Sequence, residues 1–169
     1  KSALMPYWGL TLGNQGVADV IAYMRDTFKG KRSTSTESAD TGGSNKLGAC
    51  PQKRTTLQAP AHFLEMKNPL EPTDKNIKKG KVLYLTRAKP LACKHCHGLN
   101  GDGKGFKAVN MIPPPRNFTC KKTMEPIPDG QLFWIIKNGS KDTEMQAYDK
   151  LKDKSIWQII LYLRQLGLK

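Results

Sequence analysis

The strongest chemical signal in the sequence is a run of five residues, Cys-Lys-His-Cys-His, at positions 93–97. Two thiols separated by two residues, Cys93 and Cys96, can each add to a vinyl group of one haem. His97 follows directly and can then bind the iron from one side as an axial ligand. The motif therefore predicts one covalently attached haem c.

Two other uses of a Cys-x-x-Cys pair fit this sequence less well. A structural zinc site needs a second close pair of ligands, whereas the remaining cysteines, Cys50 and Cys120, are single and far apart. A thioredoxin-like redox pair belongs with a βαβ pattern, and no such pattern surrounds residues 93–97. Haem attachment is the interpretation that remains.

A second axial ligand of a low-spin haem is usually a thioether or an imidazole. Met145 is the best candidate, because it lies 48 residues after His97 in a polar loop, where a core role explains a methionine poorly. We therefore predict His97 and Met145 as the two iron ligands. The competing candidates are Cys120, Met111, Met124 and His62.

The elements that must position these residues are helices. Apolar residues recur at helical spacing in residues 15–28, 75–86, 131–137 and 155–166, and Thr73 and Asp74 can cap the second of these helices. Three consecutive prolines at 113–115 favour an extended path. No segment alternates as a strand does, so the predicted fold class is all-α with long loops.

The chain divides into parts of different composition. Residues 31–60 are rich in Ser, Thr and Gly and almost free of large apolar residues, which is typical of an irregular linker. We therefore predict a helical segment at 1–30, a linker at 31–67 and a domain at 68–169.

The first segment matches the end of the chain. Residues 5–8 and 17–25 align, with one gap, with residues 145–148 and 156–164. This match favours a truncated repeat over coincidence. Residues 1–30 would then be the trailing half of a domain whose first half is missing.

Residues 68–166 resemble the class I c-type cytochromes, in the order first helix, attachment motif, proline-bearing loop, methionine loop and last helix. The resemblance implies the cytochrome c fold with covalently bound haem. Gly80 and Tyr84 look like the glycine and aromatic positions of the first helix, which would cross the last helix near Ile159 and Tyr162.

The same resemblance implies which residues hold the haem. One of the three prolines, taken here as Pro114, would accept the Nδ1 hydrogen of His97 through its carbonyl and so orient the ring. A plain extended loop is the alternative role of the prolines. The implied cofactor-binding residues are Cys93, Cys96, His97, Met145, Pro114 and Tyr84.

Residues 1–30 are similar to the methionine loop and last helix of the same family, so the whole chain resembles part of a tandem dihaem cytochrome. Met5 would then ligate a second haem, held by a motif upstream of Lys1. The chain contains a single Cys-x-x-Cys-His motif, so it can attach one haem covalently.

Two cysteines lie outside the motif. Haem attachment of this kind takes place outside the cytoplasm, in an oxidising setting where leftover cysteines tend to pair. Three states stay open: a disulfide between Cys50 and Cys120, two free thiols, or a Cys120 thiolate bound to the iron. The setting predicts the periplasm or another extracytoplasmic compartment of a bacterium.

The charge balance is strongly basic, with 28 Lys and Arg against 14 Asp and Glu and a net charge of +14. Lysines flank the attachment motif and the methionine loop and would ring the exposed haem edge, which steers acidic redox partners; a merely solvated basic face is the alternative. No basic helix accompanies the charge, so nucleic-acid binding is not predicted, whereas association with an anionic membrane surface stays open. These lysines are Lys89, Lys94, Lys104, Lys107, Lys137, Lys141, Lys150, Lys152 and Lys154.

Together these features predict extracytoplasmic electron transfer, by a free carrier or by a relay subunit of a respiratory oxidoreductase complex. The sequence shows no nucleophile with a matching base and no paired-carboxylate site, so the chain itself is not expected to be an enzyme. The alternative is a haem enzyme whose open or Cys-ligated sixth position acts on a small inorganic substrate.

Overall fold

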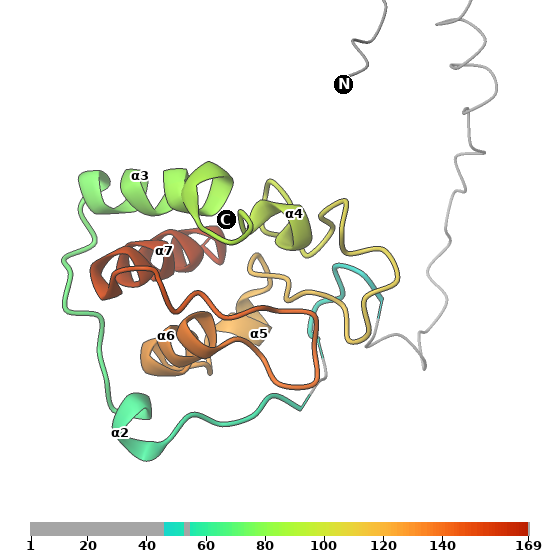
Figure 1. Ribbon diagram of the computed structural model, residues 1–169, viewed down its shortest axis with the longest axis horizontal. Coiled ribbons are helices and arrows are strands. Elements are labelled where there is room, and N and C mark those ends of the chain that lie inside the picture. The colour runs from blue at the N-terminus through green and yellow to red at the C-terminus, as the bar shows by residue number, and fades with distance from the viewer. Residues whose placement is uncertain (1–45, 53–54, 169) are drawn as a thin grey trace, which may run out of the picture. The chain divides into compact units, whose positions relative to one another are not determined.

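Figure 1 shows a computed structural model of the protein, which describes residues 46–52 and 55–168. The helix predicted at 15–28, Met5 and the N-terminal half-repeat lie outside these residues. None of the described residues forms a strand, which confirms the all-α fold class. The described elements are α2 (Ala61–Leu64), α3 (Asp74–Val82), the π-helical turn η1 (Leu83–Arg87), α4 (Lys94–His97), α5 (Lys121–Met124), α6 (Asp129–Asn138) and α7 (Asp153–Leu166).

Helix α3 begins where the sequence predicts a helix cap. The Thr73 hydroxyl accepts a hydrogen bond from the Asn76 amide at 3.3 Å, and Asp74 places a negative charge in the first turn. The helix continues directly into η1, where the Ala88 amide donates to the Leu83 carbonyl at 2.9 Å. The two elements together cover the helix predicted at 75–86.

Helices α3 and α7 lie side by side and meet at a glycine (Figure 1). A Cβ at Gly80 would overlap the backbone carbonyl of Gln158 and would lie 3.1 Å from the Ile159 amide nitrogen, so only glycine allows this approach. One turn later, Tyr84 packs edge-on against Tyr162 with 5.3 Å between the ring centroids. The predicted crossing near Ile159 and Tyr162 is confirmed.

The core is centred on α7. Ile156, Ile159 and Ile160 are almost completely buried, and Trp157 stacks on Phe133 of α6 with 4.5 Å between the ring centroids. Burial of one isoleucine side chain contributes about 1.5–3 kcal/mol. Helix α7 is therefore the rigid scaffold against which α3, η1 and α6 pack.

Helices predicted at 131–137 and 155–166 are present as α6 and α7, each starting two residues earlier than predicted. The short helices α2, α4 and α5, of four residues each, were not predicted. One helical turn contains too few residues to display a hydrophobic period, so only tertiary packing defines these elements.

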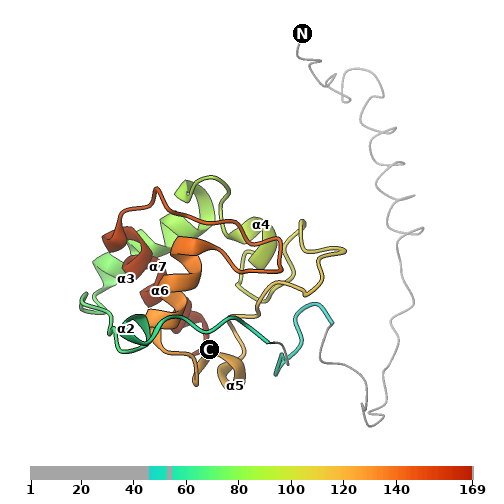
Figure 2. The same ribbon diagram turned by 60° about the horizontal axis from the view of Figure 1, so that its bottom comes forward.

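The described part of the predicted linker is attached to the helical domain. We call residues 46–52 and 55–59 the strap; it runs past α5 and α6 in Figure 2. The Gln131 side chain of α6 accepts a hydrogen bond from the Ala59 amide at 2.7 Å and donates to the Leu57 carbonyl at 2.9 Å. A disulfide joins Cys50 to Cys120.

These bonds join the described part of the predicted linker to the helical domain predicted at 68–169. The strap and the helices belong to one compact unit. Buried amide side chains and a disulfide make the attachment, and a composition rich in Ser, Thr and Gly does not reveal either. In the part of the chain that the structure describes, no helix has both the length and the apolar character needed to cross a bilayer.

Candidate functional site

Four of the predicted site residues line one pocket. Cys93, Cys96 and His97 face it from the α4 region, and Met145 faces it from the loop before α7. The pocket has a volume of about 720 Å³, including the part open to solvent. The other lining residues are Leu91, Ala92, Met111, Pro113, Pro115, Arg116, Ile136, Thr143, Glu144, Gln146 and Tyr148.

Helix α4 holds the two thiols and the imidazole on a single turn. The Cys93 carbonyl accepts hydrogen bonds from the amides of Cys96 at 3.2 Å and His97 at 2.9 Å, which closes that turn. The helix ends at Gly98, whose φ of +84° is a left-handed conformation that glycine adopts without strain. The turn thus presents both cysteines and the histidine to one cavity.

Burial keeps the two thiols neutral. Desolvation raises the pKa of the Cys93 thiol to about 12 and also raises the pKa of Cys96. No group of three or more His, Cys, Asp or Glu side chains that could hold a metal ion occurs among residues 46–52 and 55–168. Two thiols beside one imidazole fit covalent haem attachment.

The orientation of His97 is set by two contacts. Its Nδ1 lies 3.0 Å from the backbone carbonyl oxygen of Arg116, and its ring stacks on Phe118 with 4.4 Å between the centroids. A carbonyl oxygen can only accept, so Nδ1 carries the proton and Nε2 is the nitrogen of the neutral ring that can bind a metal.

The acceptor for Nδ1 corrects the expectation of a proline carbonyl. The structure uses the carbonyl of Arg116, the residue directly after the three prolines. The prolines at 113–115 have a fixed φ and bring the chain to the pocket in an extended path, but the hydrogen-bonding carbonyl lies one residue beyond them. Pro113 and Pro115 line the pocket, and Pro114 is buried beside them.

The loop that carries Met145 is folded by its own polar groups. The Thr143 hydroxyl donates to the Ser140 carbonyl at 2.7 Å and accepts from the Met145 amide at 3.1 Å. The Met145 carbonyl accepts from the Ser140 amide at 3.1 Å, and Gly139 begins the loop with a φ of +80°. These bonds hold the backbone in place while the methionine side chain packs on the core and lines the pocket.

The competing iron ligands are placed differently. Cys120 is oxidised in the disulfide with Cys50, so of the three states left open the disulfide is present and a Cys120 thiolate ligand is wrong. Met124 is a core residue with 3% exposure, and His62 is exposed on α2. Met111 does line the pocket, so it is the remaining competitor of Met145.

Tyr84 does not line the pocket and lies behind the attachment turn. Its side chain is completely buried, and its hydroxyl donates to the Gly98 carbonyl at 2.7 Å. Burial raises the pKa of this phenol far above its usual value, so it stays protonated as a donor. Tyr84 therefore supports the end of α4 rather than the pocket wall.

Tyr148 is a pocket residue that the sequence predictions omitted. Its hydroxyl donates to the Leu91 carbonyl at 2.5 Å, which ties the loop before α7 to the segment before α4. Burial raises the pKa of Tyr148 well above its usual value. The signal that could have found it is the repeated spacing of a methionine and an aromatic residue, since Trp8 follows Met5 as Tyr148 follows Met145.

Comparison with known proteins identifies a matching family and a similar solved structure. The family described as cytochrome C oxidase, cbb3-type, subunit III, matches residues 75–163. No curated protein matches the chain. A chain of the Kuenenia stuttgartiensis reducing HAO-like protein complex is similar in structure, with 27% sequence identity and a TM-score of 0.50. The match covers 61% of the present chain and 48% of that chain, so the present chain spans about half the length of this relative.

Proposed function

The chain belongs to the cytochrome c oxidase, cbb3-type, subunit III family through residues 75–163, and we propose that it transfers electrons through one haem c with His97 and Met145 as axial ligands. A cytochrome c domain binds haem c covalently and serves electron transfer. The observation that carries the proposal is that the thiols of Cys93 and Cys96, the His97 imidazole and the Met145 thioether line a single pocket.

The residues of the pocket suit this role without further catalytic groups. Each of the thiols of Cys93 and Cys96 would add its S–H across one vinyl group and so form a thioether. Haem c, when bound, supplies a one-electron iron couple. Leu91 and Ile136 line the wall with apolar side chains, which exclude water from the ligands.

The test of the ligand assignment is an absorption spectrum of the oxidised protein in the near infrared, where a weak band reports a sulfur–iron bond. We expect Met145→Ala to abolish this band. Met111→Ala is the matched control, because Met111 is the other methionine of the pocket, and it should keep the band.

Two results would overturn the assignment. If Met111→Ala loses the band and Met145→Ala keeps it, then Met111 is the sixth ligand. If the native protein is high-spin and neither variant changes its spectrum, the sixth position is open and a haem enzyme that acts on a small inorganic substrate becomes the better reading.

We place the docking surface for a redox partner on the loop that follows α4. Phe106, Val109 and Ile112 are 70%, 61% and 88% exposed, and Lys104 and Lys107 lie in the same loop. The Phe106 ring packs edge-on against His95 of α4 with 5.0 Å between the centroids, which attaches the loop to the haem-binding turn.

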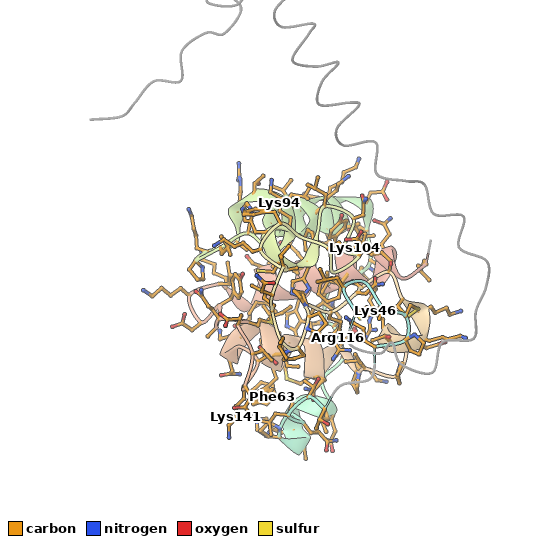
Figure 3. All side chains as sticks on the ribbon, turned by 90° about the vertical axis from the view of Figure 1, so that its right-hand side faces the viewer. Lys46, Phe63, Lys94, Lys104, Arg116 and Lys141 are labelled. Atoms are coloured by element: carbon orange, nitrogen blue, oxygen red, sulfur yellow. A yellow bond between two sulfur atoms is a disulfide. The ribbon has the colours of Figure 1, made fainter. Side chains whose placement is uncertain are left out.

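An exposed apolar patch beside positive charges suits a transient contact with an acidic redox protein. Figure 3 looks onto the face that carries Lys94 and Lys104. Association with an anionic membrane surface would use the same positive charge.

We further propose that the chain works as a relay subunit in an extracytoplasmic compartment such as the bacterial periplasm. The disulfide between Cys50 and Cys120 supports an oxidising location, and the similar structure belongs to a protein complex. Purification of the native protein under mild conditions tests the relay role: a stable complex with other redox subunits supports it, and an isolated chain favours a free carrier. A second haem bound through Met5 remains a prediction, as does the half-repeat at 1–30.

A further inference from the structure

A buried glutamine of the strap, Gln52, forms hydrogen bonds with the backbone on both sides of Arg116. The Gln52 side chain is 8% exposed, and its Nε2 donates to the Pro115 carbonyl at 2.9 Å. Its Oε1 accepts from the Asn117 amide at 2.8 Å. One side chain therefore satisfies a carbonyl and an amide that flank the residue whose own carbonyl bonds His97.

The geometry of the peptide bond links Gln52 to His97. The Arg116 carbonyl and the Asn117 amide belong to the same peptide unit, which is planar and has its C=O and N–H pointing in opposite directions. Gln52 Oε1 holds the N–H end of this unit, and His97 Nδ1 donates to its C=O end. The orientation of the carbonyl toward the histidine is therefore fixed from the side of the strap.

Further bonds join the strap to residues 116–120. The Arg116 guanidinium donates to the Thr56 hydroxyl at 3.0 Å, and the Asn117 side chain donates to the Gly48 carbonyl at 2.8 Å. The disulfide joins Cys50, two residues before Gln52, to Cys120. Figure 3 labels Arg116 and, close to it in this view, Lys46 of the strap.

We propose that Gln52 is a positioning residue for the axial histidine, acting through the Arg116–Asn117 peptide unit, and that it sets the reduction potential of the haem. The inference rests on the proposed function, in which His97 binds the iron. A hydrogen bond donated by Nδ1 makes the imidazole a stronger donor to the metal, which favours the oxidised state. Hydrogen bonds in a chain polarise one another, so Gln52 strengthens the carbonyl as an acceptor.

The test compares two buried glutamines that attach the strap to the domain. Gln52→Ala removes the two bonds around Arg116. Gln131→Ala, on α6, removes the two bonds to Leu57 and Ala59 of the strap. Both side chains are buried to a similar degree, at 8% and 9% exposure, so the two variants lose comparable structural interactions.

We expect a change of potential in one variant only. By redox titration, Gln52→Ala should favour the reduced state by about threefold to tenfold, where tenfold corresponds to about 59 mV for one electron. Gln131→Ala should leave the potential unchanged. Gln52→Leu, which retains most of the side-chain volume, should shift the potential as Gln52→Ala does and guards against a folding defect in the smaller variant.

A second readout follows the hydrogen bond itself. In the reduced protein, the exchange of the His97 Nδ1 proton with solvent, measured by NMR, should be faster in the Gln52 variants than in Gln131→Ala. The inference is overturned if both glutamine variants shift the potential equally, or if neither Gln52 variant shifts it. A chain that attaches no haem would instead overturn the proposed function.

Discussion

Two sides of the pocket are held by contacts of different range in the sequence. The histidine side is His97 with residues 115–123, and the methionine side is the loop that carries Met145. On the histidine side, Gln52 forms hydrogen bonds with residues that are 63 and 65 positions away in the sequence. The disulfide joins two cysteines that are 70 positions apart. On the methionine side, the hydrogen bonds within residues 140–145 join residues no more than five positions apart, and the Tyr148 hydroxyl adds a longer-range bond to the Leu91 carbonyl.

This difference concerns how much structure must unfold before His97 or Met145, the two proposed ligands, can leave the pocket. Separating the strap from residues 115–123 breaks contacts between distant parts of the domain, so the histidine side opens only with a large part of the tertiary structure. Residues 140–145 can open by breaking a few local bonds while Tyr148 keeps its bond to the Leu91 carbonyl, and this opening costs less free energy. The two sides should therefore respond differently to substitution.

The largest effect is expected from removing the disulfide on the histidine side. Because the bond closes a loop of about 70 residues, Cys50→Ser combined with Cys120→Ser should lower the free energy of unfolding by about 2–4 kcal/mol. Denaturant unfolding followed by circular dichroism measures this loss. The sulfur–iron band of the folded variant should persist, and its disappearance would show that the strap also supports the methionine side.

A smaller effect is expected from the methionine side. Thr143→Val removes a donor to Ser140 and an acceptor for Met145, so detachment of the methionine should become easier by about 1–2 kcal/mol. The measurement is the urea concentration at which the sulfur–iron band disappears, compared with the midpoint of global unfolding. Thr86→Val, which loses a similar bond on the exposed η1 turn, is the control and should leave the band unaffected.

Tyr148→Phe probes the contact between the methionine loop and the segment before α4. Loss of the bond to the Leu91 carbonyl should cost about 1 kcal/mol of stability at neutral pH. The folded-state pKa of Tyr148 is raised, so its contribution is complete below pH of about 10 and declines as the pH rises further. The stability difference between the native protein and Tyr148→Phe should therefore shrink above pH of about 10, and a constant difference would contradict the burial of this phenol.

The smallest effect on stability is expected from exposed lysines, which instead test where a partner docks. Lys104→Glu with Lys107→Glu should slow association with an acidic redox partner by about threefold to tenfold at low salt, because these charges lie beside the exposed apolar loop. The matched pair, Lys141→Glu with Lys150→Glu, changes the net charge by the same amount on the methionine side. Equal slowing by both pairs in stopped-flow measurements would show that the whole basic ring docks.

Much of the fold was predictable because its signals are local. The spacing of the two cysteines and the histidine, the cap at Thr73 and the apolar period of residues 155–166 each lie within a few turns of chain. Gly80 was recognisable through the family resemblance, and the overlap with Gln158 gives the physical reason for it. The short helices and the attachment of the strap carried no comparable local pattern.

The sequence by itself determined that the chain carries a haem-attachment motif, because the motif occupies five consecutive residues, and it predicted the methionine ligand from a methionine in a polar loop. The tertiary structure alone decided that Cys50 pairs with Cys120, that Arg116 rather than a proline provides the carbonyl for His97, and that Tyr84 lies behind the pocket. Each of these outcomes depends on which groups far apart in the sequence come into bonding distance, and the packing of the whole domain sets that distance.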